Sequence, residues 1–304
     1  MRVRVLGSAA GGGFPQWNCN CPNCRGLRAG TLEARPRTQS SIAVSGDGEA
    51  WVLFNASPDI RQQLGSFAAL QPGRALRDTA ICGVVLVDAQ IDHTAGLLIL
   101  REGRPLDIYC TDPVYEDLTT GNPVLKLLEH YCGVNRVPIP LGPEASFRVE
   151  GAEGLRFTAL SLDSKPPPFS PRRNAPSPGD NIGIQVEDER SGGILFYAPG
   201  LGRMSPELCR RMAASDCVLV DGTFWTEDEM IRLGAGHKRA ADMGHLPQSG
   251  EGGMLQLLRP MKDTRKVLIH INNTNPILNE ASKERAELEA AGVEVAYDGM
   301  EIEL

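Results

Sequence analysis

The chain has 304 residues, of which 41% are hydrophobic and 23% charged, and its formal net charge is −7. A chain of this length can bury a large core, and it contains no apolar run of the roughly 18–20 residues that a membrane helix needs. The negative net charge argues against a protein that follows nucleic-acid phosphates by bulk electrostatics. The N-terminus is interrupted by arginines and lacks a signal-peptide core, so we expect a cytoplasmic protein.

Apolar runs of strand and helix periodicity predict a mixed α/β fold without a strict βαβ repeat. The predicted strands span residues 2–6, 41–44, 51–54, 84–87, 106–110, 155–162, 182–186, 194–198, 217–220, 267–270 and 293–297. The predicted helices span residues 94–101, 124–131, 205–213, 249–258 and 277–290. Ser57, followed by Pro58, is predicted to cap a further helix. No segment resembles an interdomain linker, so we expect one domain over residues 1–304.

Two irregular segments are expected near a functional site. The glycine-rich turn 7–13 lacks the Lys-Ser/Thr ending of a phosphate loop, so we expect it to pack closely against a site or a neighbouring loop. The proline-rich segment 163–179 cannot form regular secondary structure. It is either a solvated loop or a lid over a pocket, and we favour the lid because long irregular loops in compact domains are often functional.

Three of the eight cysteines, Cys19, Cys21 and Cys24, are clustered within the turn-rich segment 17–25, which resembles neither a helix nor a strand. A chain of this length without a secretion signal favours metal binding over a disulfide framework. Zinc–thiolate sites usually have four ligands. We therefore predict a structural zinc ion in this loop, and the alternative is three unliganded thiols.

Three apolar runs each end in residues that can bind a metal ion. These polar ends are Asp88, Gln90, Asp92 and His93 after residues 84–87, Asp221 after 217–220, and His270 after 267–269. Strand ends of open sheets often face a common crevice, so the repeated pattern predicts one shared metal site. Taken alone, Asp221 could be a turn former before glycine, and His270 a hydrogen-bonded core histidine.

These strand ends resemble the metallo-β-lactamase superfamily, in which a His-x-His-x-Asp-His motif, a bridging aspartate and a final histidine each follow a strand. Here the first motif is the segment 88–93, in which Asp88 and Gln90 replace the first two histidines. Within the superfamily, residues 7–21, 88–93 and 243–247 resemble the family of pyrroloquinoline quinone (PQQ) biosynthesis protein B. The resemblance covers essentially the whole chain and implies a single-domain α/β fold, an αββα sandwich.

The resemblance also implies a role in making PQQ from a peptide-derived glutamate–tyrosine precursor. The implied activity is iron- and dioxygen-dependent hydroxylation of the tyrosine ring. One alternative is a soluble carrier that assists transport of PQQ or its precursor to the periplasm. A second alternative is a metal-dependent phosphodiesterase on the same fold. Other proteins of the PQQ pathway and a second copy of the chain, forming a homodimer, are further partners left open.

The superfamily motif leaves four ligands, Asp92, His93, Asp221 and His270, which are enough for one metal ion. A two-metal hydrolase needs more ligands than these. Two histidines, carboxylate oxygens and open positions fit iron(II) that must bind dioxygen, although zinc and manganese would also be accepted. The assignment of Fe(II) therefore follows from the resemblance. Asp88 and Gln90 mark the position of the lost second metal, and we expect both at the catalytic pocket.

The remaining predicted site residues have surface or structural alternatives. His245 follows a glycine in a loop and is predicted to act as an acid or base, with a structural loop histidine as the alternative. Asn273 stands where a related phosphodiesterase has its fourth zinc ligand, so the fourth ligand is its amide oxygen, a water or another residue. The predicted anchors for the substrate carboxylates, each with a solvated surface role as its alternative, are Arg172, Arg203, His237 and Lys238.

Overall fold

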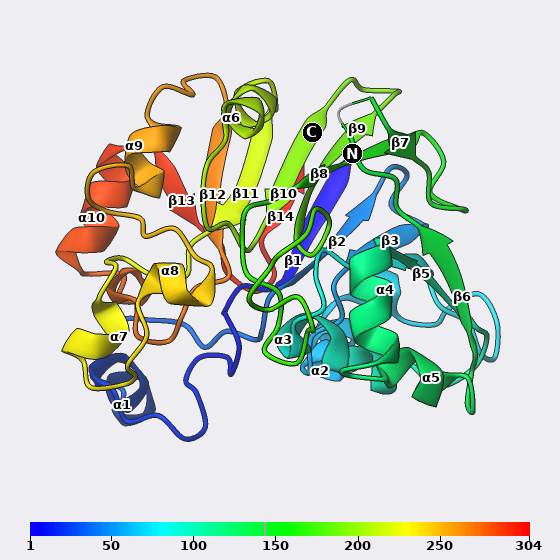
Figure 1. Ribbon diagram of the computed structural model, residues 1–304, viewed down its shortest axis with the longest axis horizontal. Helices are drawn as coiled ribbons and strands as arrows, with labels where there is room; N and C mark the ends of the chain where they lie inside the picture. Colours follow the sequence, from blue (N-terminus) through cyan, green and yellow to red (C-terminus); the bar gives the residue numbers. More distant parts are fainter. Residues whose placement is uncertain (143) are drawn as a thin grey trace.

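The structure is a computed structural model, and it describes residues 1–142 and 144–304. Two seven-stranded sheets pack face to face, and helices cover their outer faces (Figure 1). The first sheet has the order β14 (Glu301–Glu303), β1 (Arg2–Gly7), β2 (Ser41–Ser45), β3 (Trp51–Phe54), β4 (Ile81–Val85), β5 (Leu106–Cys110) and β6 (Val134–Pro138). The second has the order β13 (Val293–Val295), β12 (Arg265–Ile269), β11 (Cys217–Asp221), β10 (Ile194–Ala198), β9 (Ile182–Asp188), β8 (Leu155–Ser161) and β7 (Ser146–Phe147).

The helices lie in two groups, one outside each sheet (Figure 1). The group beside the first sheet contains α2 (Ile60–Ser66), α3 (Ile91–Thr94), α4 (Asp112–Thr119) and α5 (Val124–Leu128). The group beside the second contains α1 (Pro22–Ala29), α6 (Pro206–Ala213), α7 (Glu229–Arg232), α8 (Ala240–Met243), α9 (Met254–Leu258) and α10 (Lys283–Ala290). The predicted αββα sandwich is therefore confirmed. No helix of the described residues has the length and apolar content required to span a bilayer.

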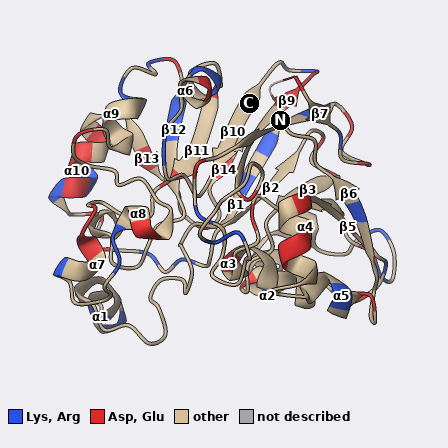
Figure 2. Ribbon diagram, viewed as in Figure 1, with Lys and Arg blue, Asp and Glu red and all other residues tan. Residues whose placement is uncertain are grey.

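The central core lies between the sheets, and aromatic rings join the two layers. The ring of Phe54 on β3 packs edge-on against Tyr197 on β10 with centroids 5.5 Å apart, and it also contacts Phe157 on β8 at 6.2 Å. Strand β11 is buried along its whole length because its two faces contact the core and the outer helices. This two-sided burial explains the continuous apolar run that the sequence shows there. Charged residues are interspersed over the outer helices (Figure 2).

Sheet topology brings two of the predicted metal ligands together. Strands β11 and β12 are parallel, and their register pairs Asp221 with Ile269, so His270 follows directly beside Asp221. The end of the first sheet reaches the same region, because the backbone N–H of Ile182 donates to the carbonyl of Val87. The Asp88–His93 turn therefore begins where the two sheets meet.

Most predicted strands are confirmed within two or three residues, whereas several predicted helices are wrong in extent. The predicted helix 94–101 is instead α3 followed by a 3₁₀ turn at Ala95–Leu98. Gly96 packs so closely against the preceding segment that a Cβ atom there would lie 2.1 Å from the Ser57 carbonyl oxygen. The predicted helix 249–258 begins only at Met254, because Gly250 and Gly252 adopt positive φ angles in a turn.

Other boundaries differ because polar caps divide the chain in ways that periodicity does not show. The predicted helix 277–290 is a 3₁₀ turn and then α10, which starts after the capping residue Ser282. The cap predicted at Ser57 is wrong: the residue before α2 is Asp59, and the Ser57 hydroxyl accepts from its N–H. The cysteine segment 17–25 was expected to be irregular, but α1 begins inside it, with Cys21 as its N-cap.

Candidate metal centre and cysteine cluster

A cleft of about 180 Å³ opens at the strand ends. Its lining includes six of the predicted site residues, namely Asp88, Gln90, Asp92, His93, His245 and His270. The glycine-rich turn also reaches it, and a Cβ atom at Gly11 would lie 3.3 Å from a carboxylate oxygen of Asp92. The close packing of this turn against a neighbouring loop, which the sequence predicts, is therefore confirmed.

His93 is held by Asp88 and presents one unpaired nitrogen. The imidazole Nδ1 lies 2.8 and 2.9 Å from the two carboxylate oxygens of Asp88, so Nδ1–H donates to Asp88. The Nε2 atom is buried and has no hydrogen-bond partner among the described residues. A buried polar atom without a partner is costly, and a metal ion would satisfy it. Asp88, predicted to be catalytic, is here the residue that orients His93.

Asp92 lies between the imidazoles of His93 and His270. Its Oδ2 is 3.2 Å from Nε2 of His270 and 4.0 Å from Nε2 of His93. Burial raises the pKa of Asp92, but the two imidazoles outweigh burial and hold it well below its usual range. Burial lowers the pKa of His93, but the carboxylates of Asp88 and Asp92 raise it overall to about 9. One ligand atom from each of these three residues fits around a single metal ion.

Asp221 and His245 form a second pair beside His270. Nδ1 of His245 lies 2.7 Å from Oδ2 of Asp221, so Asp221 fixes this imidazole as Asp88 fixes His93. Asp221 is fully buried, and its oxygens also accept from backbone N–H groups of Leu201 and Thr223, each at 2.9 Å. Burial raises the pKa of Asp221, but the neighbouring His245 lowers it overall. His245 is thus part of the centre rather than an isolated loop histidine.

The start of the proline-rich segment 163–179 borders the cleft. Ser164 lines it and donates its hydroxyl to the Gly244 carbonyl at 2.7 Å. The side-chain amide of Gln90 donates to the Lys165 carbonyl at 3.2 Å. Gln90 therefore connects the Asp88–His93 turn to the segment that we predicted to be a lid.

The guanidinium of Arg172, a predicted substrate anchor, is engaged by carboxylates of its own chain. Its Nε donates to Asp180 at 2.7 Å and its Nη2 to Asp117 at 2.8 Å, and both carboxylates are buried. Glu116 is a third carboxylate partner. Because Glu116 and Asp117 both lie on α4, these ion pairs attach the proline-rich segment to that helix.

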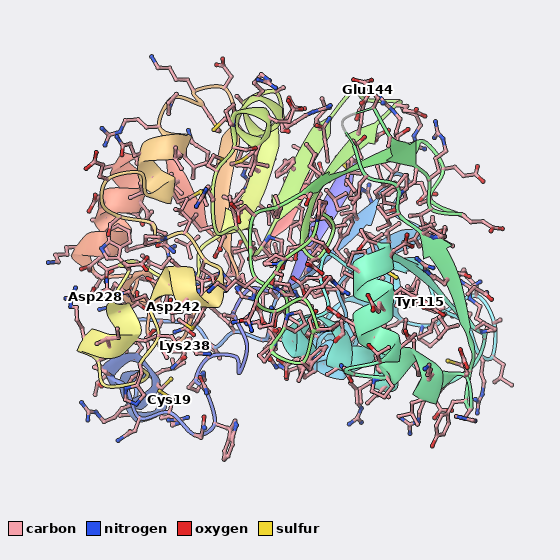
Figure 3. The ribbon with its side chains drawn as sticks, viewed as in Figure 1. Cys19, Tyr115, Glu144, Asp228, Lys238 and Asp242 are labelled. Atoms are coloured by element: carbon pink, nitrogen blue, oxygen red, sulfur yellow. The ribbon has the colours of Figure 1, made fainter. Side chains whose placement is uncertain are left out.

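The other three predicted substrate anchors lie outside the lining of the cleft. The side chain of Arg203 is 81% exposed and lies 3.4 Å from the carboxylate of Asp163. His237 and Lys238 are exposed on the loop between α7 and α8, where Figure 3 labels Lys238. Sequence position could not separate these surface cations from residues that face the pocket.

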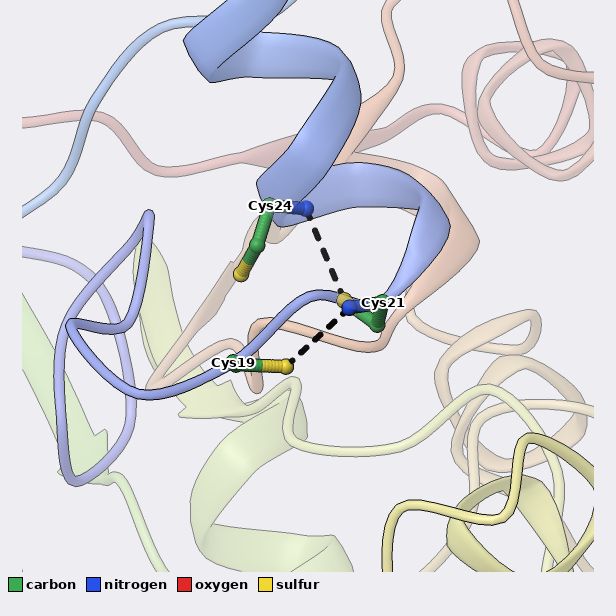
Figure 4. A group of neighbouring side chains, drawn as sticks. All are labelled: Cys19, Cys21 and Cys24. Carbon is green, nitrogen blue, oxygen red and sulfur yellow. Dashed lines mark hydrogen bonds between the residues drawn. The ribbon is translucent and has the colours of Figure 1, made fainter.

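The three clustered cysteines converge at the start of α1 (Figure 4). The amide nitrogen of Asn273 lies 3.0, 3.6 and 3.3 Å from the sulfur atoms of Cys19, Cys21 and Cys24. Ligand atoms of a tetrahedral zinc site with sulfur and oxygen donors are separated by about 3.5 Å. A flip of the amide would put its oxygen in the same place. The Asn273 side chain thus contacts all three sulfur atoms at about the distance that a fourth zinc ligand would have.

Glu229 lies behind the loop that carries His270 and Asn273. It is buried, and its carboxylate accepts from the backbone N–H of Trp225 at 2.7 Å and from the Thr274 hydroxyl at 2.6 Å. Burial raises the pKa of Glu229 to about 7, above its ordinary value of 4.5. Sequence reasoning missed this residue because an isolated glutamate beside an exposed segment gives no sign of burial.

The raised pKa of Glu229 predicts a pH dependence of stability. Below pH 4.5 the carboxyl is protonated in both the folded and the unfolded chain, so this group does not oppose folding. As pH rises from 4.5 to 7 the unfolded chain loses the proton first, and the free energy of unfolding falls by about 3 kcal/mol. We expect Glu229→Gln to be more stable than the wild type at pH 8 and equally stable at pH 4, measured by denaturant unfolding. Asp228→Asn is the control, and an unchanged pH slope in Glu229→Gln would contradict the burial argument.

Comparison with known proteins agrees with this architecture. The beta-lactamase superfamily domain matches residues 50–271 of the chain, so the fold and the site define a member of the metallo-β-lactamase superfamily. Coenzyme PQQ synthesis protein B of Methylobacillus flagellatus is 63% identical over 303 residues, 99% of each chain. The protein of the same name from Azoarcus sp. is 66% identical over 306 residues and covers 100% of both chains. The chain therefore belongs to the family of coenzyme PQQ synthesis protein B.

Solved structures show the same relationship. The crystal structure of Zn²⁺-bound PqqB from Methylobacterium extorquens has a TM-score of 0.91 with 42% identity, over 100% of both chains. A diphosphatase of the PhnP family has a TM-score of 0.70 at 17% identity, over 100% of this chain and 97% of its own. The second likeness shows a shared fold only.

Proposed function

We propose that this protein acts in PQQ synthesis as an iron(II)- and dioxygen-dependent hydroxylase of the tyrosine ring in a glutamate–tyrosine precursor. The names of its relatives support the pathway. The main support for a metal ion is the Nε2 atom of His93, which is buried, has no hydrogen-bond partner among the described residues and lies beside Asp92 and His270. Two imidazoles and a carboxylate with room for further ligands form a set that iron(II) oxygenases use.

Asp92, His93 and His270 are the proposed iron ligands, with Asp221 retained as the fourth. Asp221 would have to give up one of the hydrogen bonds that its two oxygens accept, so the structure supports it less strongly than the other three. When bound, iron(II) would supply the dioxygen chemistry that amino-acid side chains lack. Zinc at the cysteine cluster is proposed as a separate, structural ion.

The surrounding side chains would bind and orient the precursor. His245 lines the cleft with its ring fixed by Asp221, so it can hold a hydrogen bond to the phenolic group. Arg172 is engaged by buried carboxylates and Arg203 lies outside the cleft lining, so an amide is the better anchor for a substrate carboxylate. Asn181 lines the cleft, and its buried side-chain nitrogen has no hydrogen-bond partner among the described residues.

The competing two-metal hydrolase has less support. The residues at the position of its second metal are already engaged, Asp88 with His93 and Gln90 with the Lys165 carbonyl. A hydrolase would also need two metal ions to activate and position water. We therefore expect one metal ion per chain at this centre.

The test is anaerobic loading with one equivalent of iron(II), followed by exposure to oxygen in the presence of the precursor. We expect oxygen consumption and a product that has gained oxygen on the tyrosine ring, detected by mass spectrometry. The chain loaded with zinc at the same centre is the control and should not turn over. Tight binding of the precursor without metal-dependent turnover would instead support a carrier. Cleavage of a phosphodiester with two metal ions bound would support the hydrolase.

A further inference from the structure

One hydroxyl group joins the two halves of the metal centre. Thr223 is buried two residues after Asp221, and its Oγ1 lies 2.6 Å from Oδ1 of that carboxylate. The same oxygen lies 2.9 Å from Nδ1 of His270 and 3.1 Å from Nδ1 of His245. Sequence reasoning did not single out Thr223, because a threonine after Asp-Gly resembles any turn residue.

The number of protons on this hydroxyl fixes the direction of its hydrogen bonds. A threonine hydroxyl has one proton to donate and two lone pairs that accept. The Asp221 carboxylate is the nearest acceptor, and bonds to an ionised oxygen are about twice as strong as neutral ones. The proton of Thr223 therefore goes to Asp221, and Oγ1 accepts from Nδ1–H of His270. That arrangement leaves Nε2 of His270 to face Asp92 at 3.2 Å.

We propose that Thr223 is a positioning residue that holds His270 with Nδ1 protonated and Nε2 turned toward the metal. The inference rests on the metal centre of the proposed function. It completes a pattern in which Asp88 orients His93 and Asp221 orients His245. Outer groups of this kind fix the tautomer and the ring direction of metal-binding histidines. At His270 the group is neutral, so no further carboxylate is added to a centre that already has three.

Thr223 also supports a strained backbone. His270 has a φ angle of 61°, and among residues 1–142 and 144–304 Asn55 is the only other non-glycine residue with a positive φ. The His270 carbonyl oxygen lies 2.9 Å from Oγ1 of Thr223 and is the more distant acceptor for its single proton, so the backbone here is held by the Thr223 carbonyl, which accepts from the N–H of Asn272 at 3.1 Å. The test must therefore separate the hydroxyl from the space that the side chain fills.

Two substitutions make that separation. Thr223→Val keeps the shape and removes the hydroxyl, whereas Thr223→Ser keeps the hydroxyl and removes a methyl group. Each variant is prepared with one equivalent of zinc at the cysteine cluster and is then titrated with Co²⁺, whose absorption bands report binding to histidine and carboxylate. We expect Thr223→Val to bind Co²⁺ about 10–100-fold more weakly than the wild type and Thr223→Ser to retain most of the affinity.

The second readout is the ¹⁵N chemical shifts of the His270 ring in the chain without Co²⁺. We expect the pattern of an Nδ1–H ring in the wild type and in Thr223→Ser, and a changed pattern in Thr223→Val. If Thr223→Val does not fold, Thr223→Ala takes its place in both measurements. Wild-type Co²⁺ affinity together with an unchanged ring pattern in the variant without the hydroxyl overturns the proposal. Neither readout needs turnover, so failure of the hydroxylase proposal would leave this test valid.

Discussion

Asp92→Ala is expected to lose iron at the strand-end centre and, with it, hydroxylation of the precursor. Replacing a group that only orients a metal-binding histidine typically costs 10–100-fold in metal affinity. Asp92 lies next to two proposed ligands, His93 and His270, so its removal should weaken iron binding by more than about 100-fold. Iron content after dialysis, together with the rate of oxygen uptake, measures the effect.

Charge gives the physical reason for so large an effect. Buried Asp88 and Asp221 and half-buried Asp92 place three carboxylates at this centre, and no arginine or lysine lines the cleft among the described residues. Buried carboxylates need compensating charge, which a divalent ion supplies together with the imidazoles. Asp163→Ala removes an exposed carboxylate from the proline-rich segment and is the matched control. Full iron content and wild-type turnover in Asp92→Ala would show that the metal lies elsewhere or is not needed.

Cys21→Ser is expected to lose the zinc ion of the cysteine cluster and to lower thermal stability at the same time. The side chain of Cys21 caps α1 by accepting from the N–H of Cys24. Serine is a good N-cap residue, so the substitution keeps the cap and removes the thiolate. Loss of a structural zinc ion should cost several kcal/mol, which corresponds to a decrease in Tm of roughly 5–10 °C. Metal analysis and calorimetry on the same sample measure both quantities.

Two further variants locate the effect. Cys82→Ser removes a thiol that contacts the Trp51 carbonyl, outside the cluster, and should leave the zinc content unchanged. Asn273→Asp should retain zinc because it keeps an oxygen at the fourth corner, whereas Asn273→Ala should bind it more weakly. If Cys21→Ser retained both its zinc and its Tm, the cluster would be three unliganded thiols.

The Asp92 and Cys21 predictions concern two ends of the same loop. His270 and Asn273 are three residues apart, and Asn273 contacts all three cysteine sulfurs. Zinc at the cluster would therefore fix one end of the segment whose other end carries His270, a proposed iron ligand. We expect part of the iron affinity to be lost in Cys21→Ser as well.

The sequence alone was sufficient where a local pattern has one physical solution. Short apolar runs such as 217–220 are typical of buried strands, and the polar residues that follow parallel strands meet at one edge. Asp92, His93 and His270 could be predicted as neighbours for that reason. The cysteine spacing likewise predicted convergence of three thiolates, because Cys19, Cys21 and Cys24 are too close in the chain to separate far.

Only the tertiary structure shows which distant groups form hydrogen bonds or ion pairs with each side chain. Arg172 resembles a substrate anchor in the sequence, but the buried carboxylates of Asp117 on α4 and of Asp180 pair with its guanidinium. Asp88 was expected at the catalytic pocket, at the position of a lost second metal, but only the fold shows that its carboxylate holds the ring of His93. Thr223 gives no sequence signal because its importance comes from contacts made by folding. Hydrogen-bond partners are neighbours in space and need not be neighbours in sequence. Residue types alone therefore indicated the candidate ligands of this centre, and only the fold showed which groups hold those ligands in place.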